Sequence, residues 1–137
     1  MITLLIGTKG AGKTKKLISA VEKALETSKG NVVVVEKGTK LTYDISHKAR
    51  LIDTDAYDIC GTDGLVGFLS GICAGNYDVT DILVDSTLKI IGNDLSKFEE
   101  FITEVQALKT KANINITLSV SMAEDQIPES LAKYIAK

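Results

Sequence analysis

Short apolar runs alternate with helix-like patterns along this chain, and that alternation limits the possible folds more than any other feature. Continuous apolar or β-branched runs predict buried strands over residues 2–6, 31–37, 50–54, 81–85 and 114–121. Strands separated by helices need right-handed crossovers, which place the strands in a parallel sheet that is covered on both faces. The sequence therefore predicts an α/β fold, a three-layer sandwich with a mostly parallel central sheet of about five strands and helices on both faces.

Two helices are indicated in the first half of the chain by apolar residues at intervals of three and four. The first follows residue 12 and has an apolar face. Its members are Leu17, Ile18, Val21 and Leu25. The second is predicted over residues 64–76 despite its glycines. The four-residue spacing of Gly67, Gly71 and Gly75 would let this helix sit close against a neighbour.

Three further local signals predict structure elsewhere. Residues 41–45 (LTYDI) follow a turn and are expected to form a returning strand. Ser96 and Glu99 have the spacing of a capping box at the start of a long helix. Pro128 is well placed for the first turn of a C-terminal helix.

Length, charge and composition narrow the class of protein. The 137 residues have room for one domain, and the net charge of -2 gives no overall attraction to nucleic acid, so a nucleic-acid partner is not expected. No signal-peptide pattern follows Met1, and residues 64–77 are too short and glycine-rich to span a bilayer. We therefore expect a cytoplasmic protein without membrane insertion. Cys60 and Cys73 are interpreted as reduced structural thiols, and His47 as a solvated side chain.

The connection between the first strand and the first helix has the spacing Gly7-x-x-x-x-Gly12-Lys13-Thr14. Glycines let the backbone curl so that successive N–H groups point inward, and the start of the helix adds its positive end to the same cavity. Lys13 can then reach the β- and γ-phosphates of a nucleotide, and the Thr14 hydroxyl can ligate Mg²⁺. The predicted phosphate-binding residues are Gly7, Thr8, Lys9, Gly10, Ala11, Gly12, Lys13, Thr14 and Lys15.

Strand, loop and helix together resemble those of the P-loop NTPase superfamily. The likeness in element order covers nearly the whole chain, so residues 1–137 are interpreted as a single domain of this kind. In that superfamily a hydrophobic strand ends in an aspartate that holds the Mg²⁺ shell, and Ile82-Leu83-Val84-Asp85 has this form. The resemblance implies ATP and Mg²⁺ as cofactors, with Thr14 and Asp85 at the metal.

Within the superfamily, the chain is most similar to the RecA-like ATPases, in which at least one strand lies between the loop strand and the aspartate strand. Ser86 directly after Asp85 is similar to recombinase-type strands. Glu36 ends the second strand, where RecA-like members commonly keep the carboxylate that deprotonates the attacking water. The resemblance thus implies an ATP hydrolase with Lys13 and Glu36 as catalytic residues. An exposed Glu36 that merely opens a turn is the equally weighted alternative.

Several residues carry secondary expectations. Ser119 or Ser121 resembles the polar sensor of the γ-phosphate, although a buried strand serine that satisfies backbone groups is favoured. Tyr43 can stack on adenine, but a cross-strand aromatic in a hairpin is the preferred interpretation. RecA-like ATPases usually act as oligomers with a cationic finger from a neighbour. Arg50 is the only arginine, so the finger would be Arg50, a lysine or a group on another protein.

Other functions stay open at this point. The guanine-recognition motif Asn-Lys-x-Asp does not occur, which favours ATP over GTP as the nucleotide. A small-molecule or nucleoside kinase similar to thymidine kinases is an alternative, although phosphate clamping commonly uses several arginines. A nucleotide-dependent switch or interaction protein is the third possibility. Residue 86 is serine, where other branches place a glutamate after the aspartate, so hydrolysis is expected to be slow or absent if Glu36 is not the base.

Overall fold

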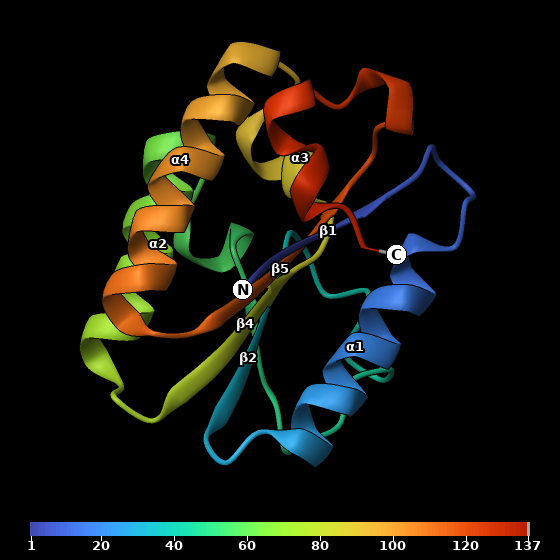
Figure 1. The fold of residues 1–137 in the computed structure, drawn as a ribbon. Coiled ribbons are helices and arrows are strands. Elements are labelled where there is room, and N and C mark those ends of the chain that lie inside the picture. Colours follow the sequence, from blue (N-terminus) through green and yellow to red (C-terminus); the bar gives the residue numbers. More distant parts are fainter. Residues whose placement is uncertain (137) are drawn as a thin grey trace.

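The computed structural model describes residues 1–136, and its centre is a five-stranded sheet in which all pairings are parallel (Figure 1). The strands lie in the order β1-β5-β4-β2-β3. Their bounds are β1 Ile2–Ile6, β2 Asn31–Glu36, β3 Arg50–Asp53, β4 Val79–Val84 and β5 Asn115–Val120. The predicted α/β class and the parallel sheet are therefore confirmed, and β5 lies between the loop strand β1 and the aspartate strand β4.

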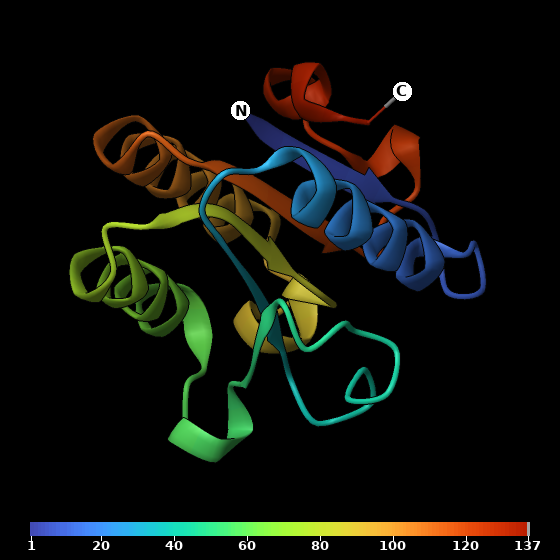
Figure 2. The same ribbon diagram turned by 90° about the horizontal axis from the view of Figure 1, so that it is seen from below.

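Helices cover both faces of this sheet (Figure 2). One face carries α1 (Lys13–Thr27), while the other carries α2 (Gly61–Gly75), α3 (Thr87–Ile91) and α4 (Leu95–Ala112). Short 3₁₀ turns occur at Asp55–Tyr57, Glu124–Gln126 and Glu129–Tyr134. This is the three-layer sandwich that the sequence predicts. None of the described helices is long and apolar enough to span a membrane.

The apolar strand runs are explained by two hydrophobic cores, one on each side of the sheet. Side chains alternate along a strand, so Val33 and Val35 of β2 pack towards α2 and α4, while Val32 and Val34 pack towards α1. All four valines are buried. A strand that is buried on both faces has no place for alternating polar residues, which is why the sequence reads as a continuous run.

The returning strand predicted for residues 41–45 is wrong. The segment between β2 and β3 forms successive turns, in which the amides of Asp44 and Ile45 donate to the Leu41 carbonyl. Leu41 and Ile45 are buried on the α1 side of the sheet. Residues four apart point to the same side of a helical turn, so both side chains can be buried without a strand. A returning strand would also have needed the edge position beside β2, which β3 occupies.

The predicted signals at the other helix ends also need correction. Asp94, not Ser96, caps α4, because its carboxylate accepts hydrogen bonds from the Ser96 and Lys97 amides at 2.9 and 3.2 Å. Pro128 precedes a 3₁₀ helix, Glu129–Tyr134, instead of an α-helix. The following residues reach β1, where the Ala136 amide donates to the Leu4 carbonyl at 2.9 Å.

The glycines of α2 do not make the close approach to another element that their spacing would allow. A Cβ placed on Gly67, Gly71 or Gly75 would meet no described atom of another segment within 4 Å. These glycines face outward, whereas Leu65 and Leu69 on the opposite side of the helix are fully buried.

Candidate functional site

The loop between β1 and α1 has a backbone that requires glycine. Gly10 and Gly12 have φ angles of 89° and 81°, in the left-handed region that side chains disfavour. Gly7 has a φ of 148°, and a Cβ there would lie 2.7 Å from the Cβ of Ala11. The three glycines of the loop, two of them in the sequence pattern, thus hold the three positions that other residues would strain.

Hydrogen bonds fix the loop at its base and across its width. The Gly7 amide donates to the Met122 carbonyl at 2.9 Å, which ties the start of the loop to the segment after β5. The Ala11 amide donates to the Thr8 carbonyl at 3.0 Å, and Lys13 Nζ donates to the same carbonyl at 3.2 Å. The Lys13 side chain therefore lies along the loop, with Thr8, Lys9 and Gly10 exposed beside it.

The first turn of α1 is suited to an anion. Gly12 occupies the N-cap position and has no side chain with which to cap the helix. The amides of Lys13, Thr14 and Lys15 have no acceptor within the helix, because no helical carbonyl lies one turn before them. No acidic residue lies in this turn, so the helix dipole and the lysines act with the same sign.

Three polar side chains from neighbouring strands lie under α1. Val84 of β4 and Leu4 of β1 are both in register with Leu118 of β5, so Asp85 follows at the level of Ser119. Val35, Val84 and Leu118 pack on the α2 and α4 side. Alternation then places the next residue of each strand on the α1 side. These residues are Glu36, Asp85 and Ser119, and all three are buried.

A hydrogen-bond network holds the Asp85 carboxylate. Ser119 Oγ donates to Asp85 Oδ1 at 2.9 Å and accepts from the Ser86 amide at 2.7 Å, while Ser86 Oγ contacts Asp85 Oδ2 at 3.3 Å. Ser86 has a left-handed φ of 50° and is the N-cap of α3. The sequence did not reveal this turn, since only the strand pairing brings Ser119 next to Asp85. Ser121, the other candidate sensor, is exposed.

Glu36 is only 3% exposed, so the interpretation as an exposed turn residue does not fit. Both carboxylate oxygens accept the Leu41 amide, at 3.1 and 3.2 Å. Burial raises the pKa of Glu36; the Leu41 and Lys40 amides oppose this shift, and the negative charges of Asp85 and Asp53 add to it. Glu36 is therefore a carboxyl poised to take a proton more readily than an ordinary glutamate.

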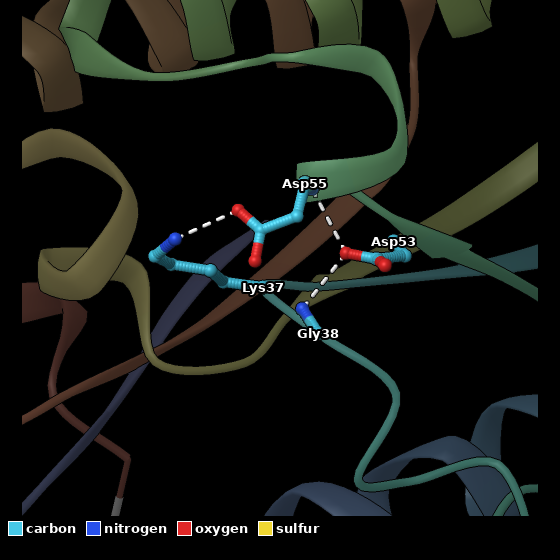
Figure 3. A network of polar contacts seen from close by, with 4 residues as sticks. All are labelled: Lys37, Gly38, Asp53 and Asp55. Carbon is cyan, nitrogen blue, oxygen red and sulfur yellow. Dashed lines mark hydrogen bonds and ion pairs between the residues drawn. The ribbon is translucent and has the colours of Figure 1, made fainter.

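A second polar cluster stabilises the loops beside Glu36 (Figure 3). Asp53 Oδ1 accepts from the amides of Gly38 and Asp55, both at 2.8 Å, and Lys37 pairs with Asp55 at 2.7 Å. This pairing raises the pKa of Lys37. The cluster joins the segments that follow β2 and β3. No sequence pattern indicated it, because it depends on the parallel pairing of these two strands.

The remaining candidates lie away from this cluster. Arg50 begins β3, so it lies at the opposite end of the parallel sheet from the loop that follows β1. Tyr43 is 99% exposed and belongs to no hairpin, which contradicts the cross-strand interpretation.

The residues present fit a nucleotide with its metal. Unpaired amides at a helix start are donors for phosphate oxygens, and the Asp85 carboxylate and the Thr14 hydroxyl are of the kind of oxygen ligand that Mg²⁺ prefers. A search with the sequence matches no protein-family model and no curated protein. The fold, a parallel α/β sandwich with this loop after its first strand, is compatible with a P-loop NTPase.

Proposed function

We propose that this chain binds ATP with Mg²⁺ through residues 7–15 and hydrolyses it as a RecA-like ATPase. The observation that carries the proposal is the loop after β1: its glycines have positive φ angles, and it leads into an uncapped helix that begins with Lys13 and Thr14. Such a loop presents backbone amides to an anion before any side chain contributes.

The sheet order supports the RecA-like branch. β5 lies between β1 and β4, as expected where a strand separates the phosphate-binding loop from the metal-holding aspartate. In this arrangement Thr14 of α1 and Asp85, directly after β4, would hold Mg²⁺. Lys13 leaves the Thr8 carbonyl to bind the β- and γ-phosphates.

Glu36 is the proposed general base. It takes a proton from a water molecule whose oxygen attacks the γ-phosphorus, the bond from that phosphorus to the bridging oxygen breaks, and ADP leaves with the bond's electrons. The raised pKa of Glu36 makes its carboxylate a better proton acceptor than an exposed glutamate. Bound Mg²⁺ would supply charge neutralisation for the phosphates.

One observation favours a second function, a nucleotide-dependent switch with little turnover. Both oxygens of Glu36 accept the Leu41 amide, so the carboxylate is already occupied by the segment after β2. If that hydrogen bond persists with nucleotide bound, Glu36 holds the segment in place instead of activating water.

Titration calorimetry with ATP, GTP and ADP in the presence of Mg²⁺, followed by phosphate release in the same samples, tests the proposal. We expect ATP binding and steady release in the native chain. Lys13→Ala should remove nucleotide binding, because it removes the cation that contacts the phosphates. Lys23→Ala, which changes an exposed lysine in the middle of α1, is the matched control and should bind normally. Unchanged ATP affinity in Lys13→Ala would contradict the phosphate-loop proposal, and binding without release would favour the switch.

A further inference from the structure

A groove lies between α2 and α4, at the end of the sheet opposite the phosphate-binding loop. It has a volume of about 580 Å³ and reaches Val79 at the start of β4 and Ile114 just before β5. Because all strands are parallel, this is the end where strands begin, whereas the loop follows the end of β1. The last turns of α2 and α4, which carry residues that line the groove, lie at the lower left in Figure 1. A ligand or partner here would leave the proposed nucleotide site free.

The α2 side of the groove is uncharged and open. Residues 64–77 contain no charged residue, although charged residues make up 25% of the chain. Tyr77 stands at the rim with 99% of its surface exposed. The outward glycines of α2 continue this surface without any protruding side chain. An exposed surface of this kind, with a large aromatic at its rim, is typical of a protein–protein contact.

The α4 side carries charge, and its pattern identifies the partner. Glu104 and Lys111 line the groove, both are exposed, and the exposed small residue Ala107 lies between them. The seven-residue separation places Glu104 and Lys111 on the same face of α4, two turns apart. If a second α4 crosses antiparallel near Ala107, Glu104 of each copy meets Lys111 of the other. A two-fold axis satisfies both pairs at once, as an isologous interface requires.

We propose that two copies of this chain associate through the groove between α2 and α4, with their α4 helices antiparallel. The two Glu104–Lys111 pairs set the register, and Tyr77 of each copy packs on the uncharged surface of the other. A contact confined to the ends of two helices is smaller than a standard interface, so we expect a dissociation constant in the range of about 1 µM to about 1 mM.

Sedimentation velocity over a concentration series tests this proposal with four charge variants. Glu104→Lys and Lys111→Glu each replace both ion pairs with like-charge pairs, and each should weaken self-association by about tenfold or more. The double variant Glu104→Lys/Lys111→Glu restores both pairs and should dimerise like the native chain. Lys23→Glu, on the other face of the sheet, is the control and should have no effect.

Mixing the two single variants gives the sharpest result. One variant carries lysine at both positions and the other glutamate at both, so a mixed pair has two favourable contacts although neither variant pairs with itself. We expect a heterodimer in the mixture. A native chain that stays monomeric up to about 1 mM overturns the proposal, as does self-association that the single variants leave unchanged. Failure of the mixture and the double variant to associate also overturns it. These sites are exposed, so circular dichroism should show native folding throughout.

Discussion

Ser119 Oγ donates a hydrogen bond to Asp85 Oδ1 at 2.9 Å, and both side chains are buried on the α1 side of the sheet. The same hydroxyl oxygen accepts the Ser86 amide at 2.7 Å. One serine on β5 therefore fixes both the proposed metal-binding carboxylate and the left-handed turn that follows it. The adjacent strands make this possible, since β4 and β5 are paired in parallel register.

Ser119→Ala should lower the free energy of unfolding by about 1–3 kcal/mol, because the Ser86 amide and the Asp85 carboxylate both lose a partner. It should also weaken ATP binding when Mg²⁺ is present, since the carboxylate is then free to rotate. Urea unfolding and calorimetry measure the two effects. Ser121→Ala is the matched control on an exposed serine and should change neither. Equal effects of the two substitutions would contradict the positioning role of Ser119.

Asp85→Asn tests the metal site directly. The amide keeps a similar shape and can still accept from Ser119, so the fold should be retained. We expect ATP affinity to fall by about tenfold or more with Mg²⁺ and to change little when the metal is chelated, because only the carboxylate charge is lost. Calorimetry with Mg²⁺ and with a chelator distinguishes a metal-binding role of Asp85 from a structural one. An equal loss with and without Mg²⁺ would show that Asp85 is structural.

The raised pKa of Glu36 predicts a pH dependence. A general base acts when deprotonated, so phosphate release should fall as pH decreases through a pKa above the usual glutamate range. Because the protonated form is favoured in the folded state, the contribution of Glu36 to the free energy of unfolding should rise over the same decrease in pH.

Glu36→Gln is the variant that isolates this group. Its amide oxygen can still accept the Leu41 amide, so the segment after β2 should stay in place. We expect normal ATP binding with phosphate release reduced by about 10²-fold or more, without the acidic limb of the native profile. Release that is unaffected in Glu36→Gln would remove Glu36 from the chemistry and favour another base.

The cluster in Figure 3 predicts unequal effects of two neighbouring aspartates. Asp53→Ala leaves the Gly38 amide and the Asp55 amide without their acceptor and should lower the free energy of unfolding by about 1–2 kcal/mol. Asp55→Ala breaks only an exposed ion pair with Lys37 and should lower the free energy of unfolding by less than Asp53→Ala does. Urea unfolding of both variants checks the order. The reverse order would mean that the ion pair, and not the amide contacts, holds these two loops together.

Local patterns in the sequence were sufficient to predict the fold class and the loop. Each of these features is short-range. Hydrophobic periodicity determines the strand runs and the helix spacing, and backbone strain at single residues determines the glycines in Gly7-x-x-x-x-Gly12-Lys13-Thr14. The β-strands lie within two residues of the predicted ranges, except for the false strand at residues 41–45. That segment was misread because Leu41 and Ile45 are buried by a turn, which uses apolar residues as a strand does.

The residues of the candidate site also fall into those that local sequence predicts and those that depend on the order of the strands. The glycine-rich loop and the helix that begins with Lys13 and Thr14 were predictable, because neighbouring residues form that structure. Three relationships were not predictable: Ser119 donates to Asp85, Glu36 is buried against the Leu41 amide, and Arg50 lies at the far end of the sheet. These relationships depend on strand order and register. Distant segments are brought together by burial of the whole sheet, which no local pattern encodes.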